Sequence, residues 1–155
     1  MDSIPALTIE DVANIDGVLQ DYLQKSESDL AVIIDKGGNV ISQYGDLEVM
    51  DVTIIAALAA GSFAATKELA RRIGEVEFNA LYHQGNGSHI FMNSVDDDTI
   101  MITVFGGQTT VGLVRFYSTS AASGLANVLR GLREKTSPGF QFSPSDIRDA
   151  HLFEN

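Results

Sequence analysis

The most apolar stretch of the chain, residues 51–73, predicts one helix of about six turns. Only two of the residues 52–65 are polar, which is typical of a helix that is covered on more than one side. Asp51 is suited to cap its N-terminus, and Arg71 and Arg72 stand where the helix dipole favours cations. We therefore expect the rest of the domain to be organised around this helix.

The two sides of this helix differ in side-chain size. The large aliphatic residues form one stripe at helical spacing: Ile54, Ile55, Leu58, Leu69 and Ile73. We expect this stripe to cover a sheet. The second surface consists of small residues flanked by one aromatic ring: Ala56, Ala57, Ala60, Gly61 and Ala64, with Phe63.

Gly61 is informative because a glycine inside a helix costs about 1 kcal/mol relative to alanine. One physical reason to accept this cost is the close approach of another backbone. We therefore predict that the small-residue surface contacts another protein, first of all a second copy of this chain. The alternative is a core helix that is covered entirely within one chain.

The remaining helices and strands are predicted from helix-capping residues and from the spacing of apolar residues. Thr8, with Asp11 three residues later, forms a capping box at the start of a helix. Strand 99–105 is apolar on both faces, so it should lie inside the sheet with helices on both sides. The segment from Val111 could be a strand by propensity, but its apolar spacing continues in phase as a helix. The expected elements are a helix over 9–25, strands 30–35 and 40–44, the helix 51–73, strands 76–83, 88–95 and 99–105, and a helix over 111–134.

This order, α-β-β-α-β-β-β-α, predicts an α/β (α+β) sandwich: a five-stranded, mainly antiparallel sheet with helices on both faces. We expect a single domain over residues 1–136, with its core at about 30–132, and a C-terminal tail over 137–155 in which 145–151 could form a helical turn. The strand after the long helix should lie at the sheet edge, where unpaired backbone groups invite another chain. Its candidate contact residues are Phe78, Asn79, Ala80, Leu81 and Tyr82.

Charge and composition narrow the range of partners. The 155 residues carry a net charge of −11, which argues against nucleic acid and an anionic membrane surface and permits a basic protein partner. The absence of cysteine excludes disulfides, thiol chemistry and cysteine-based zinc sites.

The acidic N-terminal stretch lacks the features of a signal peptide, and no uninterrupted apolar run approaches about 18 residues. We therefore expect a cytoplasmic protein that does not span a membrane.

Two histidines form the most tempting metal site. His83 and His89 flank a predicted turn, and a histidine pair on a hairpin can bind a metal ion. However, the aspartates at 96–98 lie at the opposite end of that hairpin, and no third ligand converges. We expect two surface histidines and no metal.

Other candidate chemistry has simpler explanations. Gly37 and Gly38 lack the phosphate-binding pattern and suit a tight turn. Arg71 and Arg72 could act in trans on a GTPase phosphate, although complementing the helix dipole accounts for them more simply. We expect no catalytic residue and no cofactor.

Three stretches of the chain resemble a known family. LAVIIDKGGNVIS, AALAAGSFAATKELARRIGE, and FNALYHQGNGSHIFMNSVDDDTIMITVFGG followed by VGLVRFY resemble the Roadblock/dynein light chain domain over about residues 30–132. Within this family the chain is most similar to the MglB-like group, whose members are bacterial partners of a Ras-like GTPase. The most telling positions are Ala60, Gly61, Ala64, Ala65, Thr66, Leu69 and Ala70, together with His83, Gln84 and Gly85.

The resemblance implies a homodimer that pairs its central helices and joins its sheets edge to edge. It also implies that the paired helices form a platform for a small Ras-like GTPase, whose own residues the dimer arranges for hydrolysis without inserting an arginine. Carried over by position, this platform would include Ala57, Gly61 and Ala64 with their neighbours Lys67 and Glu68. The chain would then be a GTPase-activating regulator without an active site of its own. Two alternatives remain: a structural light-chain or scaffold subunit, and a sensor that binds a ligand between the sheet and a helix layer.

Overall fold

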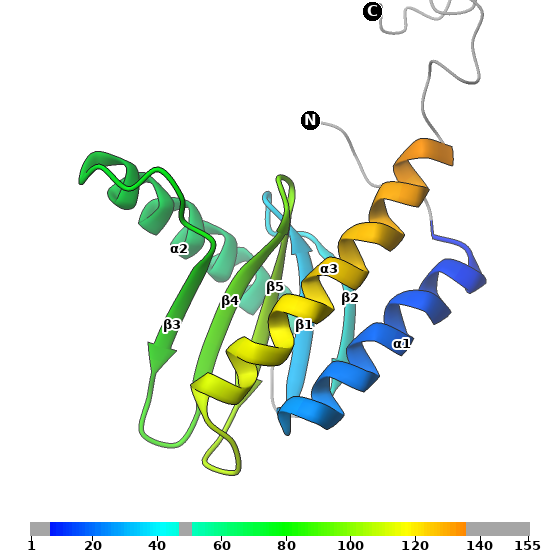
Figure 1. Cartoon of the computed structure of the whole chain (residues 1–155), viewed down its shortest axis with the longest axis horizontal. Coiled ribbons are helices and arrows are strands. Elements are labelled where there is room, and N and C mark those ends of the chain that lie inside the picture. Colours follow the sequence, from blue (N-terminus) through cyan, green and yellow to red (C-terminus); the bar gives the residue numbers. More distant parts are fainter. Residues whose placement is uncertain (1–6, 47–50, 136–155) are drawn as a thin grey trace, which may run out of the picture.

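The computed structural model describes residues 7–46 and 51–135, which form three helices and one five-stranded antiparallel sheet (Figure 1). The elements are α1 (Ile9–Ser26), β1 (Leu30–Asp35), β2 (Val40–Gly45), α2 (Val52–Arg72), β3 (Ala80–Gln84), β4 (His89–Asp96), β5 (Thr99–Phe105) and α3 (Val111–Lys135). The predicted order α-β-β-α-β-β-β-α and the predicted fold class are confirmed. The tail 137–155, with its expected helical turn at 145–151, lies outside the described residues.

The strands are arranged in the order β2-β1-β5-β4-β3, and every neighbouring pair is antiparallel. β1 and β5 therefore lie in the interior, and β2 and β3 form the two edges. The prediction that the strand after the long helix lies at an edge is confirmed. This strand begins at Ala80 and not at Val76, so two of the predicted contact residues, Phe78 and Asn79, precede it.

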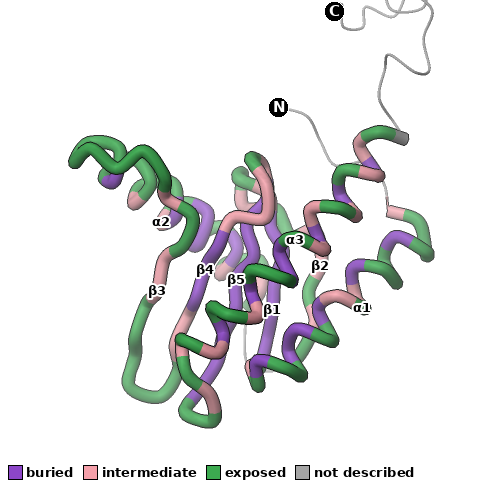
Figure 2. The backbone as a smooth tube through the Cα atoms, in the orientation of Figure 1, coloured by how far each residue is buried: buried purple, intermediate pink, exposed green. Residues whose placement is uncertain are grey.

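The helices cover both faces of the sheet, with α1 and α3 on one face and α2 on the other (Figure 1). β5 is buried along its whole length, as its doubly apolar sequence predicted (Figure 2). Its alternate side chains enter two separate cores. The α1/α3 core includes Ile15, Leu19, Ala31, Ile33, Phe91, Met101, Phe105 and Leu125. The α2 core includes Leu30, Val32, Ile34, Ala56, Ala60, Phe63, Ile102 and Val104.

Local signals fix the ends of the helices. The Thr8 hydroxyl accepts from the Asp11 backbone N–H, and the Asp11 carboxylate accepts from the Thr8 backbone N–H, both at 3.0 Å. The Asp51 carboxylate accepts from the Ile54 backbone N–H at 3.3 Å. Both predicted N-caps are therefore present, and each satisfies a donor that the helix itself leaves unpaired. The segment from Val111 is helical, as its spacing indicated.

One ion pair joins the β4–β5 turn to the end of α3. The Arg133 guanidinium donates to the Asp96 carboxylate at 2.7 Å, and both side chains are mostly buried. Burial by itself would raise the pKa of Asp96. The Arg133 guanidinium and the Asp98 backbone N–H outweigh burial and hold this pKa below its usual value. Local sequence pattern could not indicate this ion pair, because its two residues are 37 positions apart.

The Asp96–Arg133 pair makes stability depend on pH. Because the folded-state pKa of Asp96 is depressed, its contribution is present above the unfolded-state pKa of about 3.9 and is lost as pH falls through the folded-state value. Asp96→Asn should therefore lower the free energy of unfolding by about 1 kcal/mol at neutral pH, and by less in acid. Urea unfolding on both sides of that range tests this. Asp97→Asn, in the exposed part of the same turn, should have no effect, and an equal loss for Asp96→Asn at both pH values would contradict the assignment.

Candidate interaction surface on helix α2

The orientation of α2 on the sheet is the reverse of the one predicted. The face that packs on the sheet is made of small residues and one ring: Ala56, Ala59, Ala60, Phe63 and Ala70. Four of the five large aliphatic side chains that were expected to cover the sheet are instead exposed: Ile54 (55%), Leu58 (68%), Leu69 (61%) and Ile73 (74%). That prediction was wrong.

The reason lies in the strands and not in the helix. The sheet face beneath α2 already presents large side chains, namely Leu30, Val32, Ile34, Ile100, Ile102 and Val104. Helix side chains that interdigitate with them must be small, because interiors are close-packed and extra methylene groups force strain. The one large residue, Phe63, stacks at a tilt on Phe78, with ring centroids 5.1 Å apart.

This orientation divides the predicted partner-binding residues into two groups. Ala56, Ala60 and Phe63 are buried against the chain's own sheet, so they form no part of the surface, and their assignment to it is corrected here. The others, Ala57, Gly61, Ala64, Lys67 and Glu68, are exposed. For these five residues, contact with a partner remains a prediction.

The outer side of α2 carries a long exposed apolar surface, which we call the α2 stripe. It consists of Ile54, Ala57, Leu58, Gly61, Ala64, Ala65, Leu69 and Ile73. A Cβ added at Gly61 would meet no atom within 4 Å, so the middle of the stripe is open to an approaching backbone. At a different position the β1–β2 turn comes close to α2, because a Cβ added at Gly38 would lie 3.0 Å from the Ala57 Cα. A contiguous apolar surface of this kind marks an interaction site in soluble proteins.

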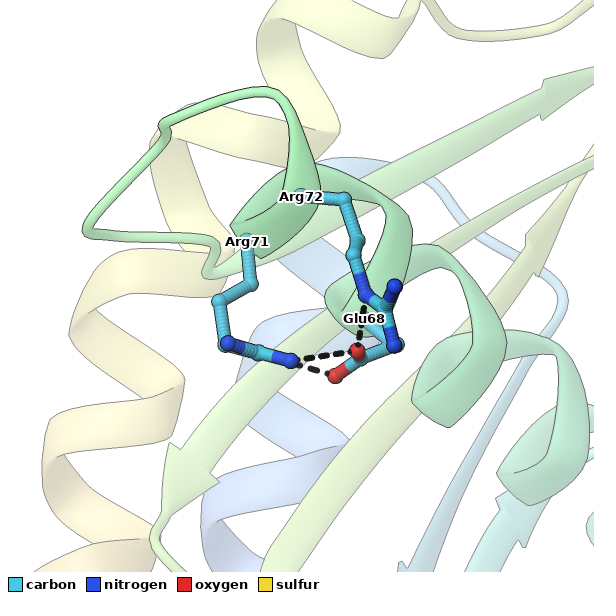
Figure 3. A network of polar contacts seen from close by, with 3 residues as sticks. All are labelled: Glu68, Arg71 and Arg72. Carbon is cyan, nitrogen blue, oxygen red and sulfur yellow. Dashed lines mark hydrogen bonds and ion pairs between the residues drawn. The ribbon is translucent and has the colours of Figure 1, made fainter.

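A charged cluster lies at the C-terminal end of α2 and consists of Glu68, Arg71 and Arg72 (Figure 3). The Glu68 carboxylate accepts from Arg71 Nε at 3.0 Å and Nη2 at 2.6 Å, and from Arg72 Nε at 2.8 Å. The hydrogen bonds from Arg71 lower the pKa of Glu68 the most, and the bond from Arg72 lowers it further. All three side chains are exposed, so the cluster adds little to stability.

The second predicted contact region is the edge strand β3. It pairs with β4 on one side, with Tyr82 opposite Phe91, and no strand among residues 7–46 and 51–135 lies on its other side. The preceding Asn79 still joins the sheet, because its carbonyl accepts from the Ser94 backbone N–H at 2.9 Å. The chain leads from the C-terminal end of α2 into this edge strand, and Phe63 of α2 packs on Phe78 just before the strand begins, so α2 reaches the β3 edge of the sheet (Figure 1).

The two histidines do not converge. Strand register places His83 opposite Ile90 and His89 opposite Gln84, which puts the two side chains on opposite faces of the sheet. His89 packs between Tyr82 and Phe105, with centroids 6.2 and 5.2 Å away. Within the part of the chain that the structure describes, no three His, Asp or Glu side chains are placed to hold a metal ion.

By length and composition alone, α2 would be able to cross a membrane. The prediction that nothing spans a membrane rests on uninterrupted apolar runs, and polar residues interrupt α2. A single helix of this kind is weak evidence, because core helices of soluble proteins pass the same test. Here the helix packs on the sheet through Ala56 and Phe63, and the α2 stripe accounts for much of its remaining apolar character.

The orientation of α2 can be tested by comparing one residue from each side. Phe63→Ala should lower the free energy of unfolding by about 3–5 kcal/mol, because it empties a buried site. Leu58→Ala should cost less than about 1 kcal/mol when unfolding is followed at low protein concentration, because that side chain is exposed within the chain. Equal losses for the two variants at low concentration would mean that the stripe faces the sheet after all.

Comparison with known proteins agrees with this architecture. The Roadblock/LC7 domain model matches residues 14–105. The structure of MglB from Myxococcus xanthus is 29% identical, with 86% of this chain and 100% of that chain covered and a TM-score of 0.77. The gliding protein MglB from Thermus thermophilus is 24% identical, with coverages of 84% and 99% and a TM-score of 0.76. An uncharacterized protein of Aquifex aeolicus is 21% identical over 137 residues, which is 86% of this chain and 84% of that protein. With more than half of its length matched by the family model, this chain belongs to the Roadblock/LC7 domain family.

Proposed function

We propose that this chain is a cytoplasmic, dimeric regulator that binds a small Ras-like GTPase and stimulates its GTP hydrolysis. The observation that carries the proposal is the α2 stripe, which presents large aliphatic side chains to solvent around an open glycine. Membership of the Roadblock family and the similarity to MglB support a regulatory role in GTPase control in general terms. The dimer, the stimulation of hydrolysis and the cytoplasmic location are the specific parts of the proposal.

Self-association would cover the apolar surface that a single chain leaves exposed. Leu58 and Leu69 are each more than half exposed, and burial of such side chains is worth about 1.5–3 kcal/mol apiece. Gly61 allows two α2 helices to cross closely, and the free edge of β3 allows two sheets to join. An MglB structure described as a tetrameric arrangement, 24% identical with a TM-score of 0.79, supports self-assembly in this fold.

Two paired α2 helices would create a platform that one helix cannot supply. Its apolar centre would come from the stripe, and Lys67 and Glu68 would lie on its polar margin. In the free chain both Arg71 and Arg72 bond to Glu68, and both stand in the last turn of α2, where they complement the helix dipole. We therefore assign the stimulation to positioning: the dimer holds the GTPase's own catalytic groups in a productive geometry, which is a large term in phosphoryl transfer.

Nucleotide dependence separates this proposal from its alternatives. The full chain should capture Ras-like GTPases loaded with a GTP analogue in preference to the same GTPases loaded with GDP, and should raise the rate of phosphate release from GTP. Binding without nucleotide preference would favour a scaffold subunit. Absence of binding to any such GTPase would reject the proposal and direct attention to a ligand-binding sensor, which a ligand-dependent rise in melting temperature would reveal.

Gly61→Arg tests whether the α2 stripe is the surface involved. Its Cβ has free space, so the chain should fold, but a bulky charge cannot be accommodated in a close apolar contact. We expect a monomeric mass by light scattering and at least about tenfold weaker GTPase binding. Gly131→Arg is the matched control, because Gly131 is also a helical glycine with nothing within 4 Å of its Cβ and lies on α3. If Gly61→Arg retained both the dimer mass and partner binding, the stripe would have neither role.

A further inference from the structure

The turn between β3 and β4 carries an asparagine–glycine pair that the proposed function does not use. The turn consists of residues 85–88, and Asn86 is followed there by Gly87. Among the asparagines of this chain, Asn86 is the one that precedes a glycine. The side-chain amide carbon of an asparagine can reach the backbone nitrogen of the next residue, and glycine leaves that nitrogen unhindered by a Cβ.

The structure leaves both members of this pair accessible. Residues 85–88 are exposed along their whole length (Figure 2). The ladder between β3 and β4 ends at Gln84 opposite His89, so the turn lies outside it. Among residues 7–46 and 51–135, no group forms a hydrogen bond with the Asn86 side-chain amide or with the Gly87 N–H. The two groups are therefore free to approach each other.

An asparagine–serine pair in the same hairpin shows the opposite situation. Asn93 is buried in β4, with 8% of its surface exposed. The N–H of the following Ser94 donates to the Asn79 carbonyl at 2.9 Å. A backbone nitrogen held in such a bond is available only after local opening of the sheet. The chain thus contains its own protected reference for the pair in the turn.

We propose that Asn86 is a site of spontaneous deamidation. The Gly87 backbone nitrogen gives up its proton to solvent base and bonds to Asn86 Cγ, and the Cγ–Nδ2 bond breaks with release of ammonia. Water then opens the resulting five-membered succinimide. Attack of water at Cγ gives aspartate, and attack at the main-chain carbonyl carbon of residue 86 gives isoaspartate. The sequence of steps needs only water and solvent base, and no oxidant, reductant or enzyme.

Both products change the edge of the sheet. A neutral amide becomes a carboxylate, so the chain gains one negative charge at the tip of the β3–β4 hairpin. Isoaspartate also inserts one carbon atom into the main chain of the turn. Within the described residues β3 is paired only with β4, so this longer turn adjoins the strand with the fewest restraints on its position. The inference does not depend on the proposed function.

Mass spectrometry of the full chain tests the inference. The folded chain is incubated in mildly alkaline buffer and then digested, and fragment spectra locate each change. Asn86 should gain the mass difference between an amide and a carboxylic acid, whereas Asn93 should keep its amide. Anion exchange of the intact chain should resolve a more acidic form, and a methyltransferase specific for isoaspartate should label the peptide that contains residue 86.

Variants test whether the unhindered glycine nitrogen is the nucleophile. A Cβ at Gly87 would meet no atom within 4 Å, and Gly87 does not adopt the left-handed backbone, so Gly87→Ala should fold. Its methyl group should slow the loss of ammonia from Asn86 by about tenfold or more. Gly107→Ala is the matched control, because a Cβ there also meets nothing within 4 Å, and it should leave the rate unchanged.

Two results would overturn the inference. The first is an intact Asn86 amide in the folded chain under conditions in which the urea-unfolded chain loses it, because the turn would then protect the pair. The second is an equal rate for Gly87→Ala and the unchanged chain, because the glycine nitrogen would then not be the nucleophile. Neither readout involves a GTPase or a dimer, so failure here is distinct from failure of the proposed function.

Discussion

Close packing between α2 and the centre of the sheet is the constraint on which the rest of this structure depends. The strands β1 and β5 are buried on both faces and fill the α2 side with large aliphatic residues. α2 can approach them only with small side chains, and it does so through Ala56, Ala59 and Ala60, with Phe63 as the single large residue. Its own large aliphatic residues must then lie on the outer side.

The α2 stripe is therefore a consequence of how the core is filled. One sheet can cover only one side of a helix that is apolar all round. In a monomer the other side is therefore exposed to water. Pairing with a second copy would remove this apolar surface from water. The open position at Gly61 and the position of β3 at the sheet edge are consistent with such pairing. The same surface would then create a site that exists only in the assembly, which links self-association to recognition of a GTPase.

The two faces of the sheet differ in charge as well as in shape. The α2 face has an apolar stripe that ends in the Glu68–Arg71–Arg72 cluster (Figure 3). On the α1/α3 face, α1 carries four acids against one lysine, and residues 116–129 of α3 carry no charged side chain. Gly17 and Gly124 are among the residues that line a hollow on this face. The sheet therefore separates two surfaces of different chemistry.

The sequence alone determined the features that depend on local periodicity and capping. The order of elements, the caps at Thr8 and Asp51 and the burial of β5 on both faces could be predicted, because each depends on residues close together in the chain. Only the tertiary structure decided which side of α2 faces the sheet, because that depends on the size of strand side chains far away in sequence. Strand register separated His83 from His89. The return of α3 across the sheet brought Arg133 to Asp96 and formed the hollow between α1 and α3. These features depend on how segments far apart in the sequence are placed in space. The spacing of apolar residues along the chain does not determine that placement.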